Sequence, residues 1–347
     1  MKFPRIFNIS ILLVFLIYVV GCSKSHSISK ISGPTMGTQY HISWVTEFST
    51  EEAAIDERTR IKRLVDELLV DFNKAMSTYD PNSELSIINK SHSDQWQVIS
   101  PDLYRVLSMA LRVNEQSQGA FDVTVGPLVN LWGFGPDKSN DHVPGVAQIN
   151  ERLALVGSSA LSLRQLDGLS ELRLSAQRYI DLSAIAKGDA VDVIGLLLQQ
   201  QGIDNYLVEV GGEIVAHGHK PESAPWRIAI EAPNDDGRSV QIVIPLSNMG
   251  IATSGDYRNY FEQDGRRFSH TIDGRTGYPV NHKLASVSVL HSSVALADAW
   301  ATALTVLGAE AGLALAEEYN LAAYFIVRHE DGFEQYSSSH FEQLRLE

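Results

Sequence analysis

The apolar and polar residues of this chain follow helical and strand-like spacing in turn. Helical periodicity over residues 51–76 and 101–118 predicts two long amphipathic helices. Alternation predicts strands over 40–45, 205–210, 213–217, 226–231 and 240–245, and a hairpin whose strands are 322–328 and 333–336. The four strands between 205 and 245 form a predicted meander, which argues against a simple doubly wound parallel sheet. We therefore expect an α+β fold: a single large domain with helices packed on mixed, mainly antiparallel sheets.

The N-terminus has the pattern of an export signal. Lys2 and Arg5 precede a nearly all-apolar segment, residues 9–20, which is too short to span a membrane. Small and aliphatic residues then lead directly to Cys22, the only cysteine of the chain, as in the lipobox of bacterial lipoproteins. We expect Cys22 to be lipidated, with an uncleaved signal anchor as the alternative. Residues 1–21 are the predicted signal peptide, residues 22–32 a flexible tether and residues 33–347 the folded domain.

Net charge and missing motifs exclude several classes of function. The formal net charge is −14 and no basic stripe is present, which argues against nucleic-acid binding. The histidines are scattered, which argues against zinc, and HExxH, GxSxG and the P-loop pattern are absent. An acidic protein that binds phosphates needs a metal ion or local cations to offset the repulsion.

A carboxylate and a hydroxyl interrupt the apolar helix predicted near the C-terminus. Asp298 and Thr302 are four residues apart, so they lie on one helical face. Buried polar groups cost free energy unless they are satisfied. A hard cation such as Mg²⁺, which takes oxygen ligands, would satisfy both side chains. The alternative is that Asp298 lies in the first turn of the helix and caps it.

Two glycine-containing segments offer backbone suited to ligand contact. Residues 119–135 hold four glycines interleaved with large apolar residues. Glycines allow close approach of a ligand to the backbone, although tight packing alone would explain them equally well. Residues 266–280 place His270, Asp273 and Thr276 on a Gly- and Pro-containing turn. Both segments are candidates for a binding site.

A strand–turn–helix junction is predicted near the middle of the chain. Residues 178–183 resemble a strand that ends near Asp181 and runs into a helix extending to about Gly202. Free backbone N–H groups at such a junction, together with Lys187, would bind a phosphate group. The alternative is an N-cap by Asp181 or Ser183 with a solvated lysine.

Taken together, these motifs resemble the ApbE-type flavin transferases, also called FAD:protein FMN transferases. The matching segments, in the order of that family, are TMGT from Thr35, STYD from Ser77, GAFDVTVGPLVNLWGFG from Gly119, YIDLSAIAKGDAVD from Tyr179, TSGDYRNYF from Thr253, SHTIDGRTGYPV from Ser269 and DAWATAL from Asp298. They span nearly the whole chain after the signal segment. The segment from Gly119 and the last two segments are the most specific.

The resemblance implies an enzyme that cleaves the diphosphate of FAD. It would transfer FMN to a threonine or serine hydroxyl of a target flavoprotein through a phosphoester bond and release AMP. It further implies Mg²⁺, with Ca²⁺ or Mn²⁺ as alternatives. The acceptors would be exported or membrane flavoproteins, such as subunits of the sodium-pumping NADH:quinone reductase or the Rnf complex. The lipid anchor would hold the protein to the membrane, at the periplasmic face of the inner one.

Two other functions fit the same sequence: a metal-dependent FAD pyrophosphatase and a non-enzymatic flavin-binding lipoprotein. For the transferase, the resemblance implies that Asp298 and Thr302 bind the metal through their side chains and that Ala184 binds it through its backbone oxygen. It also implies that His270 accepts the proton of the acceptor's hydroxyl. The implied FAD contacts are Met36, Tyr79, Ala120, Phe121, Asp122, Asp181, Lys187 and Ile272.

Three positions depart from the family pattern. Gly274 replaces a common proline, and Ala301 replaces a second acid that some members carry. Lys187 replaces a glutamate found in some members, which favours diphosphate binding. The expected metal site therefore depends on fewer carboxylates and more oxygens from water or phosphate.

Overall fold

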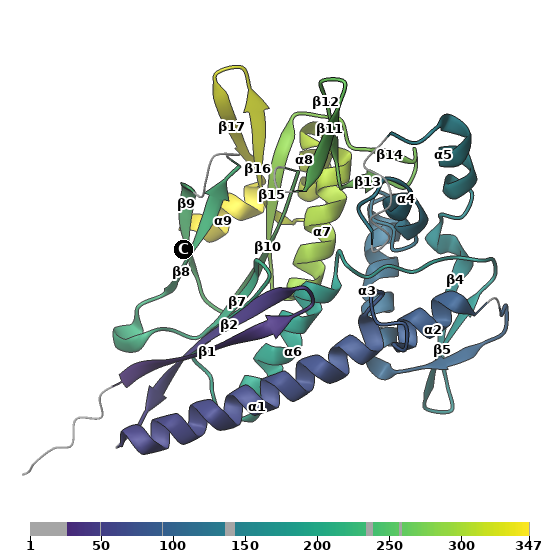
Figure 1. The fold of residues 1–347 in the computed structure, drawn as a ribbon. Helices are drawn as coiled ribbons and strands as arrows, with labels where there is room; N and C mark the ends of the chain where they lie inside the picture. Colours follow the sequence, from purple (N-terminus) through teal and green to yellow (C-terminus); the bar gives the residue numbers. More distant parts are fainter. Residues whose placement is uncertain are drawn as a thin grey trace, which may run out of the picture.

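An eight-stranded antiparallel sheet forms the centre of the computed structural model (Figure 1), which describes residues 26–48, 50–91, 93–135, 143–233, 239–256 and 259–346. Its strands, in spatial order, are β1 (His26–Thr35), β2 (Thr38–Glu47), β6 (Tyr206–Val210), β7 (Glu213–His217), β10 (Met249–Gly255), β15 (Leu284–His291), β16 (Ala322–His329) and β17 (Gly332–Ser337). Every strand pairing in the described chain is antiparallel. The predicted α+β class and the hairpin of β16 and β17 are confirmed.

Helices cover one face of this sheet: α1 (Glu51–Met76), α6 (Ala186–Gln200), α7 (Val294–Leu307) and α8 (Ala309–Glu318). Two further helices, α2 (Glu84–Lys90) and α3 (Pro101–Gln116), pack against α1, and α3 also packs against α7. Successive side chains of a strand point to opposite faces, so Tyr40, Ile42 and Trp44 of β2 are all buried in the core beneath the helices. Helix α7 lies against β10 and β15, and α6 packs between α7 and the β6–β7 hairpin. This layer therefore holds the two helices that carry the predicted metal and phosphate residues.

A hairpin and a short helix pack against the opposite face. They are β8 (Trp226–Ala232), β9 (Ser239–Leu246) and α9 (Ser339–Leu346), and they share a second core with the sheet. The predicted meander over 205–245 is wrong in its connections, because β7 pairs with β10 and β8–β9 form a separate two-stranded sheet. Trp226, Ile228 and Ile230 face the large sheet, so the hairpin covers it instead of extending it.

Smaller elements complete the domain. They are β3 (Gln97–Ile99), β4 (Leu161–Leu166), β5 (Leu169–Leu174), α4 (Gly126–Leu131), α5 (Val146–Leu153), β11 (Tyr260–Gln263), β12 (Arg266–Ser269), β13 (Ile272–Asp273), β14 (Tyr278–Pro279) and the 3₁₀ turns Ser158–Ala160 and Pro221–Ser223. Trp132 is fully buried in a third core between α4, α5 and β13. Its indole N–H donates to the carbonyl oxygen of Gly277 at 2.9 Å, which joins the glycine-rich segment to the His270 loop.

Two local predictions are wrong. Residues 178–183 form no strand. Instead, the side-chain amide of Asn89 pairs with both backbone groups of Ile180, at 2.7 and 2.8 Å, and takes the place of a neighbouring strand. Part of the predicted tether, 26–32, belongs to β1 and pairs with β2. The signal segment and Cys22 lie outside the described residues. Within those residues, no helix is long and apolar enough to cross a membrane.

The two capping alternatives are also wrong. The N-cap of α6 is Ile185, which makes no side-chain capping bond, so neither Asp181 nor Ser183 caps the helix. The N-cap of α7 is Ser293, whose hydroxyl accepts from the backbone N–H of Leu296. Asp298 lies beyond the first turn of α7 and is buried, so its carboxylate needs another explanation.

The contact between α6 and α7 yields a stability prediction. A Cβ atom at Gly188 would lie 2.4 Å from the carbonyl oxygen of Val294 and 2.8 Å from Cα of Ala295, so the two backbones would have to separate. We expect Gly188→Ala to lower the free energy of unfolding by about 1–3 kcal/mol, measured by urea denaturation. Leu196→Ala, at a residue of α6 that is 55% exposed, should change it by less than about 0.5 kcal/mol. Equal loss in the two variants would contradict this packing.

Candidate functional site

A cavity of about 800 Å³ lies between α6, α7, the sheet and the His270 loop. Among the described residues, its wall contains every residue that the resemblance assigned to metal, FAD or the acceptor's proton, except Met36. Met36 occupies the turn between β1 and β2 with φ of 48° and packs against the main core. From this turn it is Thr38 that lines the cavity. The volume is in the range of pockets that hold a large cofactor.

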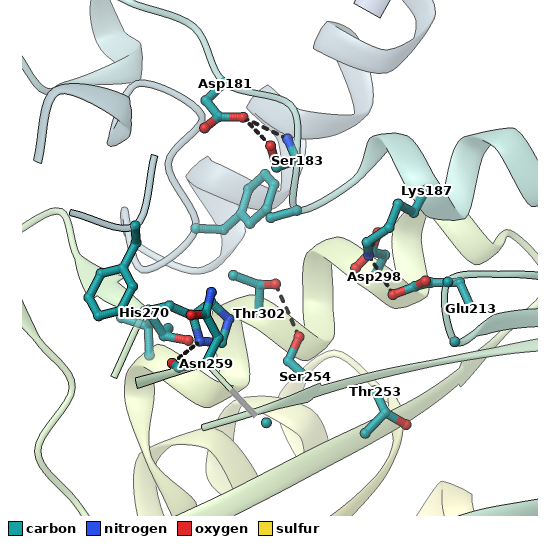
Figure 2. Close-up of a pocket in the computed structure, with 18 of the residues that line it drawn as sticks. Asp181, Ser183, Lys187, Glu213, Thr253, Ser254, Asn259, His270, Asp298 and Thr302 are labelled. Carbon is teal, nitrogen blue, oxygen red and sulfur yellow. Dashed lines mark hydrogen bonds and ion pairs between the residues drawn. The ribbon is translucent and has the colours of Figure 1, made fainter. Parts of the chain in front are cut away.

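Three charged side chains meet at one end of the cavity. Figure 2 shows Lys187 reaching towards both Glu213 and Asp298. The ammonium nitrogen of Lys187 lies 2.6 Å from Oε1 of Glu213 and 3.7 Å from Oδ2 of Asp298. Both acidic side chains are only 5% exposed. The backbone N–H of Gly188 also donates to Oδ2 of Asp298, at 3.3 Å. One lysine therefore serves two buried carboxylates.

Burial sets the protonation behaviour of this cluster. It raises the pKa of Glu213 to about 7, with Lys187 opposing the rise and Asp298 adding to it. Burial also raises the pKa of Asp298, opposed by Lys187 and the Gly188 N–H. For Lys187 burial lowers the pKa, but the two carboxylates outweigh it and the net shift is upwards. The lysine is thus charged, and a second positive charge would stabilise the ionised acids further.

Further oxygen atoms that could bind a cation line the same cavity. The hydroxyl of Thr302, one helical turn after Asp298, lies 3.2 Å from that of Ser254 on β10. Ala184, just before α6, also lines the cavity. A carboxylate, hydroxyls and a backbone carbonyl suit a hard cation such as Mg²⁺. Among the described residues there is no group of three His, Cys, Asp or Glu that could hold a metal. A cation here would therefore need further oxygens from water or phosphate.

His270 lies on the other side of the cavity in Figure 2, with Thr302 and Ser254 between it and the charged cluster. Its Nδ1 is 3.0 Å from the carbonyl oxygen of Asn259, which can only accept. Nδ1 therefore carries the proton, and Nε2 is left with a free lone pair. Burial lowers the pKa of His270. Lys187 acts in the same direction, while the Asn259 carbonyl and Asp256 oppose it. The imidazole is consequently neutral at pH 7 and able to accept a proton.

One part of the wall is apolar and aromatic. Phe121 and Ile272 are buried side chains that border the cavity, and Phe134 and Val129 continue the same surface. Tyr79 lies at the rim and is 70% exposed. Its pKa is raised by partial burial and by the nearby Asp181. Such a wall can hold a flat aromatic ring by stacking and burial.

The carboxylates of Asp122 and Asp181 have partners inside the protein. Asp122 accepts from the hydroxyls of Thr124 and Ser158, both at 2.6 Å, and from their backbone N–H groups. Oδ1 of Asp181 accepts from the N–H and hydroxyl of Ser183. These bonds shape the loops that form the wall. Asp273, by contrast, is not part of the wall and pairs with Arg275.

Several polar residues of the site were not predicted from the sequence, among them Glu213, Ser254 and Asn259. Glu213 begins the predicted strand 213–217, and alternation alone assigns it no role in a site. Ser254 and Asn259 belong to a segment that matched the family pattern without suggesting a role. The available signal was weak, because β7, β10 and the His270 loop become neighbours only in the folded chain.

Comparisons with known proteins cover almost the whole chain. A family model described as the ApbE family matches residues 36–325. The FAD:protein FMN transferase of Vibrio cholerae serotype O1 is 45% identical over 334 residues, which is 96% of this chain and 98% of that protein. The protein of the same name from Haemophilus influenzae is 45% identical over 94% of each chain.

Solved structures agree with the fold. The flavin transferase ApbE from Vibrio cholerae superimposes with a TM-score of 0.82 at 43% identity, over 92% of this chain and 99% of that one. The apo form of the flavinyl transferase ApbE from Pseudomonas stutzeri gives a TM-score of 0.82 at 38% identity, over 92% and 97%.

The charged cluster predicts a pH-dependent stability effect. Lys187→Met leaves two buried carboxylates without their cation, so we expect a loss of about 3 kcal/mol at pH 8 by urea denaturation. The loss should shrink towards pH 6, because acids with raised pKa take up protons in the folded state and no longer need the lysine. Lys74→Met, which breaks an exposed pair with Asp71 on α1, should cost less than about 1 kcal/mol. A loss at Lys187 that does not depend on pH would contradict this reading.

Proposed function

The chain belongs to the ApbE family, and from this premise we propose that it transfers FMN from FAD to a serine or threonine hydroxyl of an acceptor protein and releases AMP. One observation carries the proposal: a single cavity joins an apolar, aromatic wall to the Lys187–Asp298 cluster and to a neutral histidine. The flat ring of FAD would bind to the apolar, aromatic wall, and its diphosphate would bind at the Lys187–Asp298 cluster. The acceptor's hydroxyl would lie near the histidine, His270.

In the proposed reaction the acceptor's hydroxyl oxygen attacks the phosphorus of the FMN half. The bond from this phosphorus to the bridging oxygen breaks, and its electron pair leaves with AMP. The hydroxyl proton passes to Nε2 of His270, whose other nitrogen is held by the Asn259 carbonyl. Lys187 offsets the charge of the diphosphate, since phosphoryl transfer depends mainly on alignment and charge neutralisation.

Asp298, Thr302 and the backbone oxygen of Ala184 would hold a divalent cation, Mg²⁺ or alternatively Ca²⁺ or Mn²⁺. When bound, this cation would supply Lewis-acid stabilisation of charge on the phosphates. The chemistry of the donors supports this, because all are oxygens and the two buried acids share only one lysine. Ala301 supplies no ligand, so the remaining coordination positions would be filled by oxygens of water or of the substrate.

The anchor is proposed from the N-terminal sequence, and the acceptors from the resemblance to the family. A lipid on Cys22 would hold the protein at the periplasmic face of the inner membrane. The acceptors would then be exported or membrane flavoproteins, such as subunits of the sodium-pumping NADH:quinone reductase or the Rnf complex. The rim residues Tyr79 and Asp181 would contribute to FAD binding from the open side of the cavity.

A transfer assay tests the reaction. The form lacking the residues before Ser23 is mixed with FAD, Mg²⁺ and a threonine-containing acceptor domain, and intact acceptor mass and AMP are measured together. We expect an acceptor heavier by one phosphoester-linked FMN, and no product after chelation of Mg²⁺ or in Asp298→Ala. Asp71→Ala, whose side chain is 75% exposed on α1, should behave like the wild type.

Two other outcomes would refute the transferase proposal. AMP and free FMN with an unmodified acceptor would identify an FAD pyrophosphatase. FAD that stays intact while bound would identify a flavin-binding protein.

The role of His270 predicts a pH profile. Because a base must be neutral and the pKa of His270 is below the ordinary value of 6.5, the transfer rate should be constant near pH 7 and fall only as pH drops below that value. His270→Ala should lose about 10²–10⁴-fold in rate and lack this acidic limb, measured in single turnovers at saturating FAD. His219→Ala, at an exposed residue, should keep both the wild-type rate and the fall in rate at acidic pH. An unchanged limb in His270→Ala would assign it to another group.

A further inference from the structure

Glu213 is a buried acid at the charged end of the cavity (Figure 2), and neither the sequence motifs nor the proposed reaction uses it. One carboxylate oxygen lies 2.6 Å from the ammonium nitrogen of Lys187. The other is buried without a hydrogen-bond partner among the described residues. A buried carboxylate left half satisfied is costly, so a function for it is expected.

The turn before Glu213 is shaped around Lys187. Gly211 and Gly212 have φ of 62° and 111°, a conformation that favours glycine. A Cβ atom on Gly211 would lie 2.9 Å from the methyl carbon of Thr38 and 3.3 Å from Cδ of Lys187. The turn therefore passes directly against the aliphatic stem of the lysine. This contact places the Glu213 carboxylate where the ammonium group ends.

The ammonium group of Lys187 lies near two carboxylates, those of Glu213 and Asp298, but it forms a hydrogen bond with only one of them. It makes its hydrogen bond with Glu213, while Asp298 at 3.7 Å receives only the attraction between charges. A lysine bonded directly to Asp298 would compete with any cation for that carboxylate. In a buried site this competition is strong, because the attraction between charges is weakly screened.

We propose that Glu213 is a positioning residue, which holds the Lys187 ammonium away from Asp298 so that Asp298 stays available to a divalent cation. The same bond keeps the ammonium beside the place where the diphosphate of FAD would lie. The inference rests on the proposed function for the nature of both ligands. Glu213 itself takes part in no bond that forms or breaks.

Mn²⁺ binding without FAD tests the inference independently of turnover. The wild type, Glu213→Gln, Glu213→Asp, Lys187→Met and the Gln–Met double variant are titrated with Mn²⁺, and free Mn²⁺ is measured by electron paramagnetic resonance. We expect Glu213→Gln to weaken binding by about tenfold, because the lysine moves onto Asp298. Glu213→Asp, which keeps the charge, should restore most of the affinity. The double variant should match Lys187→Met within about twofold, since without the lysine Glu213 has nothing to position.

Two outcomes would overturn the proposal. Unchanged Mn²⁺ affinity in Glu213→Gln would remove any role in cation binding. An equal loss with and without Lys187 would make Glu213 a direct ligand of the cation. Unfolding curves of each variant show that the protein used is folded, and Glu213→Asp keeps the test valid if Lys187→Met is too unstable.

The transfer assay separates this inference from the proposed function. The defect of Glu213→Gln should appear as a higher Mg²⁺ requirement and be relieved at saturating Mg²⁺. A wild type that binds Mn²⁺ but never modifies an acceptor would refute the transferase proposal, while the Mn²⁺ comparison would still decide the role of Glu213.

Discussion

The ion pair between Lys187 and two buried acids is the interaction on which this site depends. Asp298 and Lys187 come from different helices, and they meet only because α6 and α7 pack closely at Gly188. Asp192 of α6 fixes the start of α7, because its carboxylate accepts from the hydroxyl of Ser293 at 2.8 Å and from two backbone N–H groups. The position of Asp298 is thus set by a capping bond and a close helix contact, both outside the cavity.

The same cluster explains how an acidic protein can bind an anionic substrate. The formal net charge of −14 repels phosphates at long range, so attraction has to be local. Lys187 supplies one partly buried positive charge, and the oxygen atoms that line the cavity with Asp298 can hold a cation that supplies more. His270 lies across the cavity with its proton on the nitrogen that faces Asn259. Charge neutralisation and proton transfer are therefore placed on separate walls of one pocket.

Local patterns predicted local features well. The amphipathic period over 51–76 coincides with α1, because its buried residues recur on one face. The four-residue spacing of Asp298 and Thr302 predicted that both lie on one helical face, and both line the cavity. The strand predicted over 178–183 failed because the side chain of Asn89 replaces a strand partner there. No sequence pattern distinguishes this side-chain pairing from the backbone hydrogen bonds between two β-strands. Glu213 and Ser254 escaped notice because their roles depend on which strands become neighbours in the sheet.

The most direct measurement of the central claim is a crystal structure with FAD and Mn²⁺, in which anomalous scattering locates the cation. The account predicts one peak beside Asp298, Thr302 and the carbonyl oxygen of Ala184, in contact with the FAD diphosphate, while Lys187 remains bonded to Glu213. A peak elsewhere, or a diphosphate bound away from Lys187, would contradict it.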